Sequence, residues 1–420
     1  MSRITPPKTA SAEDSRLICA DSNFSSHHRS NSEKHLVHHS RGPLVFISAA
    51  EPSADVHGAA LIRATREACP NVRFVGVAGP NMVAAGCETV YDMTGHAGML
   101  LGAIANVGRG ITMLSVADRY LRMYPFDAAV LIDSPTLHLP LSAKAQAAGV
   151  PVMYYIAPQM WAWGAYRIHK LRNRCDRVAV IFPFEEEYFR NQGVSARYVG
   201  HPLGDLIDDE TWDPAIVDEI RSLGSPVVAL LPGSRKHVVQ TMLPDQLKVA
   251  ERIAGEFRNA FFGVSVAGAN VAPLIGRLTA ASPVRNRLFP GHRAELIEAA
   301  DLVLVASGTT TLEVAFRGRP MVVMYQSSPL LYHLIARWMI HTPYLSLPNI
   351  LANREIVPEF MPYYRSTEPI AKRAIELLKS DEERRRMMDD LAAVVAPLRG
   401  RSASQNAAAM LLDMVRAARH

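Results

Sequence analysis

Short apolar runs alternate with longer amphipathic segments along most of the chain. Each run has the length of a buried strand, and a turn of small or polar residues follows it. Strands that alternate with helices predict a parallel sheet whose two faces are both covered by helices. In the first half, the predicted strands lie at residues 44–48, 72–77, 128–133, 152–156 and 178–182.

The alternation breaks once and then starts again. Residues 200–205 and an acidic stretch separate the first set of strands from a second set. We therefore predict two doubly wound α/β domains, at residues 43–205 and 206–399, with ligands at the carboxyl ends of the strands. A final amphipathic helix at about 400–420 is expected to pack back on the first domain. The second set of strands lies at residues 227–231, 260–266, 302–305 and 321–325.

The composition fits two folded domains. Of the 420 residues, 49% are hydrophobic and 20% are charged, a balance that argues against disorder over most of the length. Residues 1–42 differ, because they are polar, rich in Ser and His, and lack the apolar segment of a secretory signal. We predict that they form a disordered tail, with metal binding by the histidines as the alternative.

The net charge of +5 would suit nucleic acid, an anionic membrane surface or a phosphorylated small molecule. No run of Lys and Arg is interleaved with aromatic residues, which argues against nucleic acid as a partner. The cysteines have neither metal-binding nor disulfide spacing. The uncharged segment 97–108 is shorter than the roughly 20 residues that a membrane-spanning helix needs.

The strongest local signal follows the predicted strand at 302–305. Ser307, Gly308, Thr309 and Thr310 form a small polar turn that opens a helix, with Glu313 about one turn inside it. The free backbone N–H groups and the dipole of such a helix favour a phosphate, and Glu313 could accept hydrogen bonds from ribose hydroxyls. A helix cap without any ligand is the alternative.

A second turn follows the strand at 227–231. Gly233 and Ser234 precede Arg235, whose guanidinium could neutralise the diphosphate that leaves when a nucleotide sugar is cleaved. The alternative is a surface Arg beside a tight turn. A diphosphate held by a helix N-terminus and an Arg needs no metal, and no acidic pair stands out as a metal site.

Candidate bases follow two strands of the first half. Glu51, Asp55 and His57 come after the opening strand, and Asp133 and His138 come after a later one. A carboxylate or imidazole within reach of a sugar hydroxyl could remove its proton. Taken singly, Asp55 and Asp133 are better explained as turn formers or helix caps.

Taken in order, the separated motifs between residues 43 and 400 resemble the lipid-A-disaccharide synthase family. The motifs that carry the resemblance are Glu51-x-Ser53-x-Asp55, Gly79-Pro80-x-Met82, Trp161-Ala162-Trp163, Pro183-Phe184-Glu185, Gly200-His201-Pro202-Leu203, Leu231-Pro232-Gly233-Ser234-Arg235, Ser307-Gly308-Thr309-x-x-Leu312-Glu313 and Ser346-Leu347-Pro348-Asn349.

The resemblance implies a glycosyltransferase-B fold with an N-terminal acceptor domain and a C-terminal UDP-sugar domain. It implies inverting transfer of 2,3-diacylglucosamine from its UDP derivative to 2,3-diacylglucosamine 1-phosphate, which makes the β-1,6 disaccharide of lipid A and requires no cofactor. Asn349 would join the two phosphate turns in holding UDP. Because both substrates are acylated, the resemblance implies a peripheral position on the cytoplasmic face of the inner membrane. Whether the protein forms a homodimer is left open by the sequence.

The chain departs from the family pattern mainly in its first half. Ala50, Ala54 and Ala78 stand where the family has Gly, so close approach of the backbone or a positive φ is harder there. The change with the largest chemical consequence comes after Asp133.

Thr136 replaces an Asp that the family pattern makes a favoured catalytic candidate, and Thr cannot act as a base near neutral pH. His138 stands where the family tends to have Asn, and we hypothesise that it takes over as the base, with Asp133 or His57 in reserve. Two alternatives remain, a transferase with a different lipid acceptor and a UDP-sugar-binding relative without catalytic activity.

Overall fold

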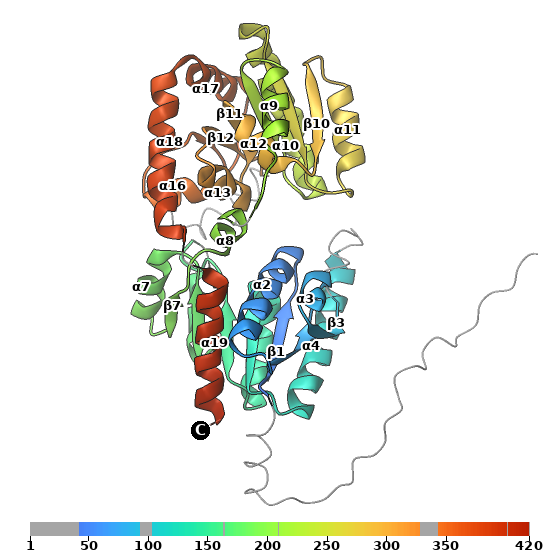
Figure 1. The fold of residues 1–420 in the computed structure, drawn as a ribbon, viewed down its shortest axis with the longest axis vertical. Helices are drawn as coiled ribbons and strands as arrows, with labels where there is room; N and C mark the ends of the chain where they lie inside the picture. The colour runs from blue at the N-terminus through green and yellow to red at the C-terminus, as the bar shows by residue number, and fades with distance from the viewer. Residues whose placement is uncertain are drawn as a thin grey trace, which may run out of the picture. The chain divides into compact units, whose positions relative to one another are not determined.

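The computed structural model of the chain describes residues 42–92, 103–162, 164–208, 210–327, 343–400 and 402–419. The strands of the first half form a seven-stranded sheet in the order β3-β2-β1-β4-β5-β6-β7, and every described pairing is parallel (Figure 1). These strands are β1 (Leu44–Ala49), β2 (Arg73–Val77), β3 (Cys87–Tyr91), β4 (Ala128–Ile132), β5 (Val152–Tyr155), β6 (Arg177–Val180) and β7 (Ala196–Tyr198).

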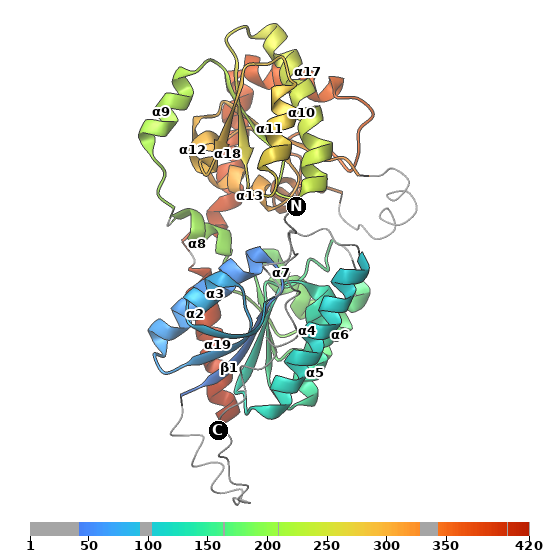
Figure 2. The same cartoon turned by 90° about the vertical axis from the view of Figure 1, so that its right-hand side faces the viewer.

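Helices cover both faces of the first sheet (Figure 2). Side chains alternate along a strand, so Val45 and Ile47 enter one apolar cluster while Phe46 enters the other. The first cluster lies under α2 (Pro52–Ala68), α3 (Pro80–Ala84) and α19 (Ala403–Arg419), and the second under α4 (Ala103–Met123), α5 (Pro135–Ala147) and α6 (Ile168–Arg174). A further helix, α7 (Pro183–Asn191), follows β6.

The second sheet has six strands in the order β10-β9-β8-β11-β12-β13, again with parallel pairings throughout. They are β8 (Val227–Leu231), β9 (Phe261–Val266), β10 (Asn286–Pro290), β11 (Leu302–Ala306), β12 (Met321–Met324) and β13 (Glu359–Phe360). The helices of this half are α8 (Pro202–Asp208), α9 (Pro214–Ser222), α10 (Lys236–Glu256), α11 (Ala272–Ala280), α12 (Arg293–Ala299), α13 (Thr309–Phe316), α16 (Leu347–Ala352), α17 (Glu368–Lys379) and α18 (Asp381–Val395).

Each apolar run of the sequence is a strand in the structure, and the predicted α/β class is confirmed. Four strands had not been predicted, namely β3, β7, β10 and β13. All four lie at or beside an edge of a sheet, where the strands are short or half exposed and the continuous apolar signal is lost.

The last helix packs against the first sheet's layer rather than the second. Helix α19 lies along α2 (Figure 1) and contributes Leu411 and Val415 to their shared apolar cluster. Asp205 accepts hydrogen bonds from the backbone N–H groups of Ala403 and Ser404 and so caps the helix.

Several predictions fall on residues outside the described ranges. These are the disordered tail, apart from Gly42, and residues 97–102 of the uncharged segment. Among the helices that the structure describes, none combines the length and apolar character needed to cross a membrane.

Candidate functional site

Two places in the fold are suited to bind a ligand. In each sheet the strand order reverses once, between β1 and β4 and between β8 and β11. Ligands of doubly wound sheets bind beyond the carboxyl ends of the strands at such a point. Glu51 and Asp133 follow β1 and β4, while Arg235 and Ser307 follow β8 and β11, so the predicted residues gather at these two places.

The turn after β11 leaves the N-terminus of α13 open. Gly308 has φ 151°, a conformation that favours glycine, and no heavy atom lies within 4 Å of where its Cβ would be. Among the described residues, no side chain forms a capping hydrogen bond with this helix. Because the first N–H groups of a helix have no partner within it, those of Thr309 and Thr310 are suited to bind an anion.

The turn after β8 lies next to the turn after β11. Gly233 has φ 100°, and a Cβ there would lie 3.2 Å from Val238 Cγ1 and 3.9 Å from Ala306 Cβ. Only glycine therefore combines this backbone conformation with such close packing. Arg235 is exposed at the start of α10, and no described acidic residue forms a salt bridge with it.

Gln246 links the two strands that precede these turns. Its side chain is fully buried, and Nε2 donates hydrogen bonds to the carbonyl oxygens of Leu231 at 3.3 Å and Leu304 at 3.0 Å. The amide group thus links the last residue of β8 to the middle of β11. Sequence reasoning missed this residue, because a Gln inside an amphipathic helix carries no sign of its partners.

Glu313 is already paired with a cation. Its side chain is 7% exposed, and Arg293 Nε donates to Glu313 Oε1 at 2.9 Å. The ion pair fixes the carboxylate beside the open turn of α13, with one oxygen engaged. Binding of ribose by Glu313 stays a prediction.

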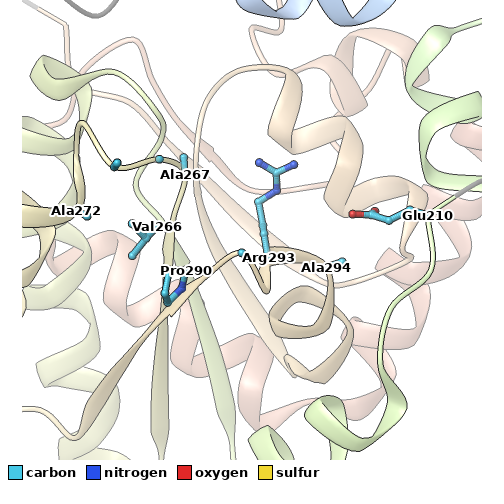
Figure 3. Close-up of a pocket in the computed structure, with 10 residues that line it drawn as sticks. Glu210, Val266, Ala267, Ala272, Pro290, Arg293 and Ala294 are labelled. Atoms are coloured by element: carbon cyan, nitrogen blue, oxygen red, sulfur yellow. The ribbon is translucent and has the colours of Figure 1, made fainter. Parts of the chain in front are cut away.

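A pocket of about 560 Å³ lies at the carboxyl ends of β9 and β10 (Figure 3). The Arg293 side chain projects beside Val266 and Ala267, and Glu210 lies on the opposite side. The pocket was not predicted, although small-residue turns follow both strands. The other lining residues are Gly268, Ala269, Ala272, Pro290, Gly291 and Ala294.

Asn349, the remaining residue predicted to contact UDP, is fully buried. Its Oδ1 accepts from the backbone N–H groups of Ile356 and Val357, and its Nδ2 donates to Val357 O and to Glu359 Oε2. All the hydrogen-bonding positions of the amide are occupied by the protein. Asn349 therefore holds its loop in place and offers UDP no free group in this conformation.

Asp133 lies in an unusual backbone conformation at the end of β4. Its φ is 51° and that of Ser134 is 45°, so two successive residues with side chains lie in the left-handed region. Each costs on the order of 1–2 kcal/mol, and such strain concentrates at functional sites. The carboxyl is half buried, and burial raises its pKa, with the charge of Glu51 adding to the rise and a backbone hydrogen bond from Ser134 opposing it.

His138, our predicted base, is fully buried. Its Nδ1 lies 2.8 Å from Asp133 O and its Nε2 lies 2.9 Å from Ser48 Oγ, so both ring nitrogens are engaged by the protein. Burial lowers its pKa to about 4. In this conformation the ring presents no nitrogen to a substrate, whereas Asp133 is only half buried and Thr136 is exposed.

Asp55 has a clear structural role. Its carboxylate is buried and accepts hydrogen bonds from the backbone N–H groups of Gly79, Asn81 and Met82, which cap α3. Burial lowers the pKa of the nearby helical residue His57 to about 4. The alanines that replace family glycines, Ala50, Ala54 and Ala78, are buried and do not have positive φ, so their methyl groups are accommodated.

Comparisons with known proteins extend these observations. A model of the lipid-A-disaccharide synthetase family matches residues 45–412. The lipid-A-disaccharide synthase of Syntrophus aciditrophicus (strain SB) is 35% identical over 384 residues, which cover 89% of this chain and 98% of that protein. The enzyme of the same name from Pseudomonas putida (strain KT2440) is 33% identical over 376 residues, with coverage of 89% and 98%.

Solved structures with low sequence identity share the architecture. The UDP-GlcNAc 2-epimerase from Neisseria meningitidis bound to UDP-GlcNAc aligns with a TM-score of 0.57 at 12% identity, covering 89% of this chain and 99% of that one. MurG from Acinetobacter baumannii aligns with a TM-score of 0.53 at 14% identity and the same coverage. These likenesses concern the fold alone, which is the predicted glycosyltransferase-B fold. By the family match and the two relatives together, this chain belongs to the lipid-A-disaccharide synthetase family.

Proposed function

We propose that this chain transfers 2,3-diacylglucosamine from its UDP derivative to 2,3-diacylglucosamine 1-phosphate, forming the β-1,6 disaccharide of lipid A and releasing UDP. Family membership supports the activity. The observation that carries the proposal at the level of the site is the pair of adjoining turns after β8 and β11. An open helix N-terminus and the exposed cation of Arg235 lie together there, as a departing diphosphate requires.

The donor is assigned to residues 206–399. The diphosphate would bind the N–H groups at the start of α13, with Arg235, Ser234 and Ser307 around it. The neighbouring pocket, with its wall of small residues and Arg293, has the size for a pyrimidine base and part of its ribose. Glu313 lies on α13 and is paired with the pocket residue Arg293, and it would accept from a ribose hydroxyl.

The acceptor is assigned to residues 43–205. In the transfer, the acceptor hydroxyl oxygen attacks the anomeric carbon from the face opposite the diphosphate, the bond to the diphosphate oxygen breaks, and the configuration inverts. A base must take the hydroxyl proton. We assign this role to Asp133 rather than to His138, because Asp133 is only half buried and its pKa is raised, whereas both ring nitrogens of His138 are engaged by the protein. Glu51 would tune that pKa, and Thr136 would contact the acceptor.

Peripheral binding at the cytoplasmic face of the inner membrane is part of the proposal, because both substrates carry acyl chains. Exposed apolar side chains on the acceptor half support it, among them Ile111 and Tyr166 with exposures of 60% and 70%, together with exposed cations such as Arg172. Co-sedimentation with anionic vesicles tests this position. Sedimentation velocity decides between a monomer and the homodimer.

The activity is tested by incubating the protein with UDP-2,3-diacylglucosamine and 2,3-diacylglucosamine 1-phosphate and detecting the disaccharide by mass spectrometry. We expect disaccharide and an equal amount of UDP, and a loss of turnover in Arg235→Ala. Turnover only with another acylated acceptor would favour the related transferase. Thermal stabilisation by UDP with no turnover on any acceptor would favour the relative without catalytic activity.

A further inference from the structure

The strained turn at the end of β4 is held by hydrogen bonds to buried side chains. Asp133 and Ser134 both have positive φ, which residues with side chains adopt only when surrounding contacts fix them. The Asp133 carbonyl oxygen accepts one hydrogen bond from Tyr154 OH at 2.6 Å and lies 2.8 Å from His138 Nδ1. Both donors come from outside the turn.

The partners of His138 determine its tautomer. A carbonyl oxygen can only accept, so Nδ1 carries the proton and donates to Asp133 O. Nε2 must then be the acceptor, and the Ser48 hydroxyl donates to it at 2.9 Å. Burial keeps the ring neutral, which this pair of bonds requires.

These side chains tie the turn to its neighbours on both sides. Ser48 lies on β1 and Tyr154 on β5, the two strands that flank β4, and His138 lies on the helix that the turn begins. The backbone N–H of Asp133 donates to Tyr155 O at 3.0 Å. The turn is therefore held at the N–H and at the carbonyl of Asp133, and Asp133 itself is only half buried.

We propose that His138 is a positioning residue, which with Tyr154 and Ser48 fixes the Asp133 carbonyl and thereby aims the Asp133 carboxylate at the acceptor hydroxyl. We call these three side chains the carbonyl clamp. The inference rests on the proposed role of Asp133 and gives His138 no contact with the substrate. It also explains why a buried ring with both nitrogens engaged lies beside the proposed base.

Two substitutions separate this role from that of a base. His138→Asn keeps a donor close to the position of Nδ1 but cannot accept a proton from a substrate. His138→Leu removes the donor and keeps an apolar volume. Ser142→Ala is the matched control, since it removes another buried polar group from α5, one that donates to Leu139 O and does not contact the turn.

We expect His138→Leu to lower kcat roughly 10- to 100-fold, the effect of a misplaced reacting group, with KM changed by less than about threefold. His138→Asn should retain kcat within about threefold of Ser142→Ala, because the Asp133 carbonyl keeps its donor. In His138→Leu the acid limb of the kcat profile should also move, since the carboxyl loses its fixed surroundings.

Equal loss of kcat in His138→Asn and His138→Leu would overturn the proposal and indicate that His138 itself takes the proton. A kcat of His138→Leu equal to that of Ser142→Ala would overturn it as well. So would a wild-type kcat in Asp133→Asn, because the clamp would then have no base to position, although disaccharide would still form.

A measurement on the folded wild-type protein is independent of turnover and of how the variants fold. The ¹⁵N chemical shifts of the His138 ring near neutral pH should report a neutral ring with the proton on Nδ1. A proton on Nε2, or a charged ring, would overturn the clamp. If no disaccharide forms with any acceptor, the proposed function fails, and the ring tautomer still decides whether the clamp exists.

Discussion

At the scale of single residues, the site depends on how Asp133 is placed. Its pKa is raised by burial, and the negative charge of Glu51 contributes to the rise. A base works only when it is deprotonated, so a raised pKa means that activity is lost at a higher pH as the solution is acidified. A substitution of Glu51, which contributes to the raised pKa of Asp133, therefore tests the assignment of the base as directly as a substitution of Asp133 does.

We predict that Asp133→Asn lowers kcat by roughly 10²- to 10⁴-fold, the usual contribution of a general base.

Glu51→Gln should move the acid limb of the kcat/KM profile to lower pH, because the carboxylate of Asp133 loses a negatively charged neighbour that raises its pKa. Initial rates of UDP release across the pH range measure both effects. Glu67→Gln, an exposed position on the helix α2 that Glu51 precedes, is the control. The prediction would be contradicted if Glu67→Gln moved the acid limb of the profile as far as Glu51→Gln does.

The sequence located most of the candidate residues but could not assign their roles. It placed Asp55 and Asp133 after strands, where both could act on a substrate. The structure separates them, because Asp55 is buried with partners from residues 79–82, while Asp133 is only half buried. Likewise the amide NH₂ group of Asn349 donates both of its hydrogen bonds within the protein, to Val357 O and to Glu359 Oε2. Such partners follow from the folding of distant segments, which no local pattern records.

At the scale of elements, α3 depends on a carboxylate from another helix. This short helix begins at Pro80 without a side-chain cap of its own, and Asp55 of α2 supplies the acceptor for its first N–H groups. Charge matters here because a buried carboxylate also interacts with the helix dipole.

We predict that Asp55→Asn lowers the free energy of unfolding by about 1–3 kcal/mol, as for the loss of charged hydrogen bonds to a buried cap. Urea denaturation at neutral pH measures it. Asp218→Asn, an exposed carboxylate on α9, should change the value by less than about 0.5 kcal/mol. If Asp55→Asn changed the free energy of unfolding as little as Asp218→Asn does, the hydrogen bonds from α3 to Asp55 would contribute little to stability.

The elements themselves were largely predictable. The interior strands are apolar on both faces, so their runs mark them directly. Edge strands such as β3 and β10 each have only one buried residue among five, so they give a weak apolar signal. The pocket after β9 and β10 was missed for the same reason, since one of its two strands was not recognised.

At the scale of the whole molecule, stability should depend on pH through buried histidines. Burial lowers the pKa of His138 to about 4 and that of His201 to about 3. A group whose pKa is lowered in the folded state stabilises the fold above its unfolded pKa of 6.5, and this contribution is lost as the pH falls toward the folded value.

We predict that unfolding becomes easier by about 2 kcal/mol for each of these histidines between about pH 7 and about pH 5. His201→Asn should remove its share, because the amide oxygen can still accept from Leu203 N–H as Nδ1 does at 3.1 Å, without being titratable. Urea midpoints at the two pH values measure the difference. An unchanged pH dependence in His201→Asn would refute the assignment.

The position of α19 has a consequence for how the protein is made. The helix packs on α2, yet 334 residues separate the end of α2 at Ala68 from the start of α19 at Ala403. At a synthesis rate of ~10 residues per second, α19 is synthesised about half a minute after α2, so the part of α2 that packs against α19 stays uncovered for that time. During that time the nascent first half exposes the apolar part of α2 that α19 later covers. A chaperone that shields nascent chains would find its binding site there, and release would await the arrival of Leu411 and its neighbours.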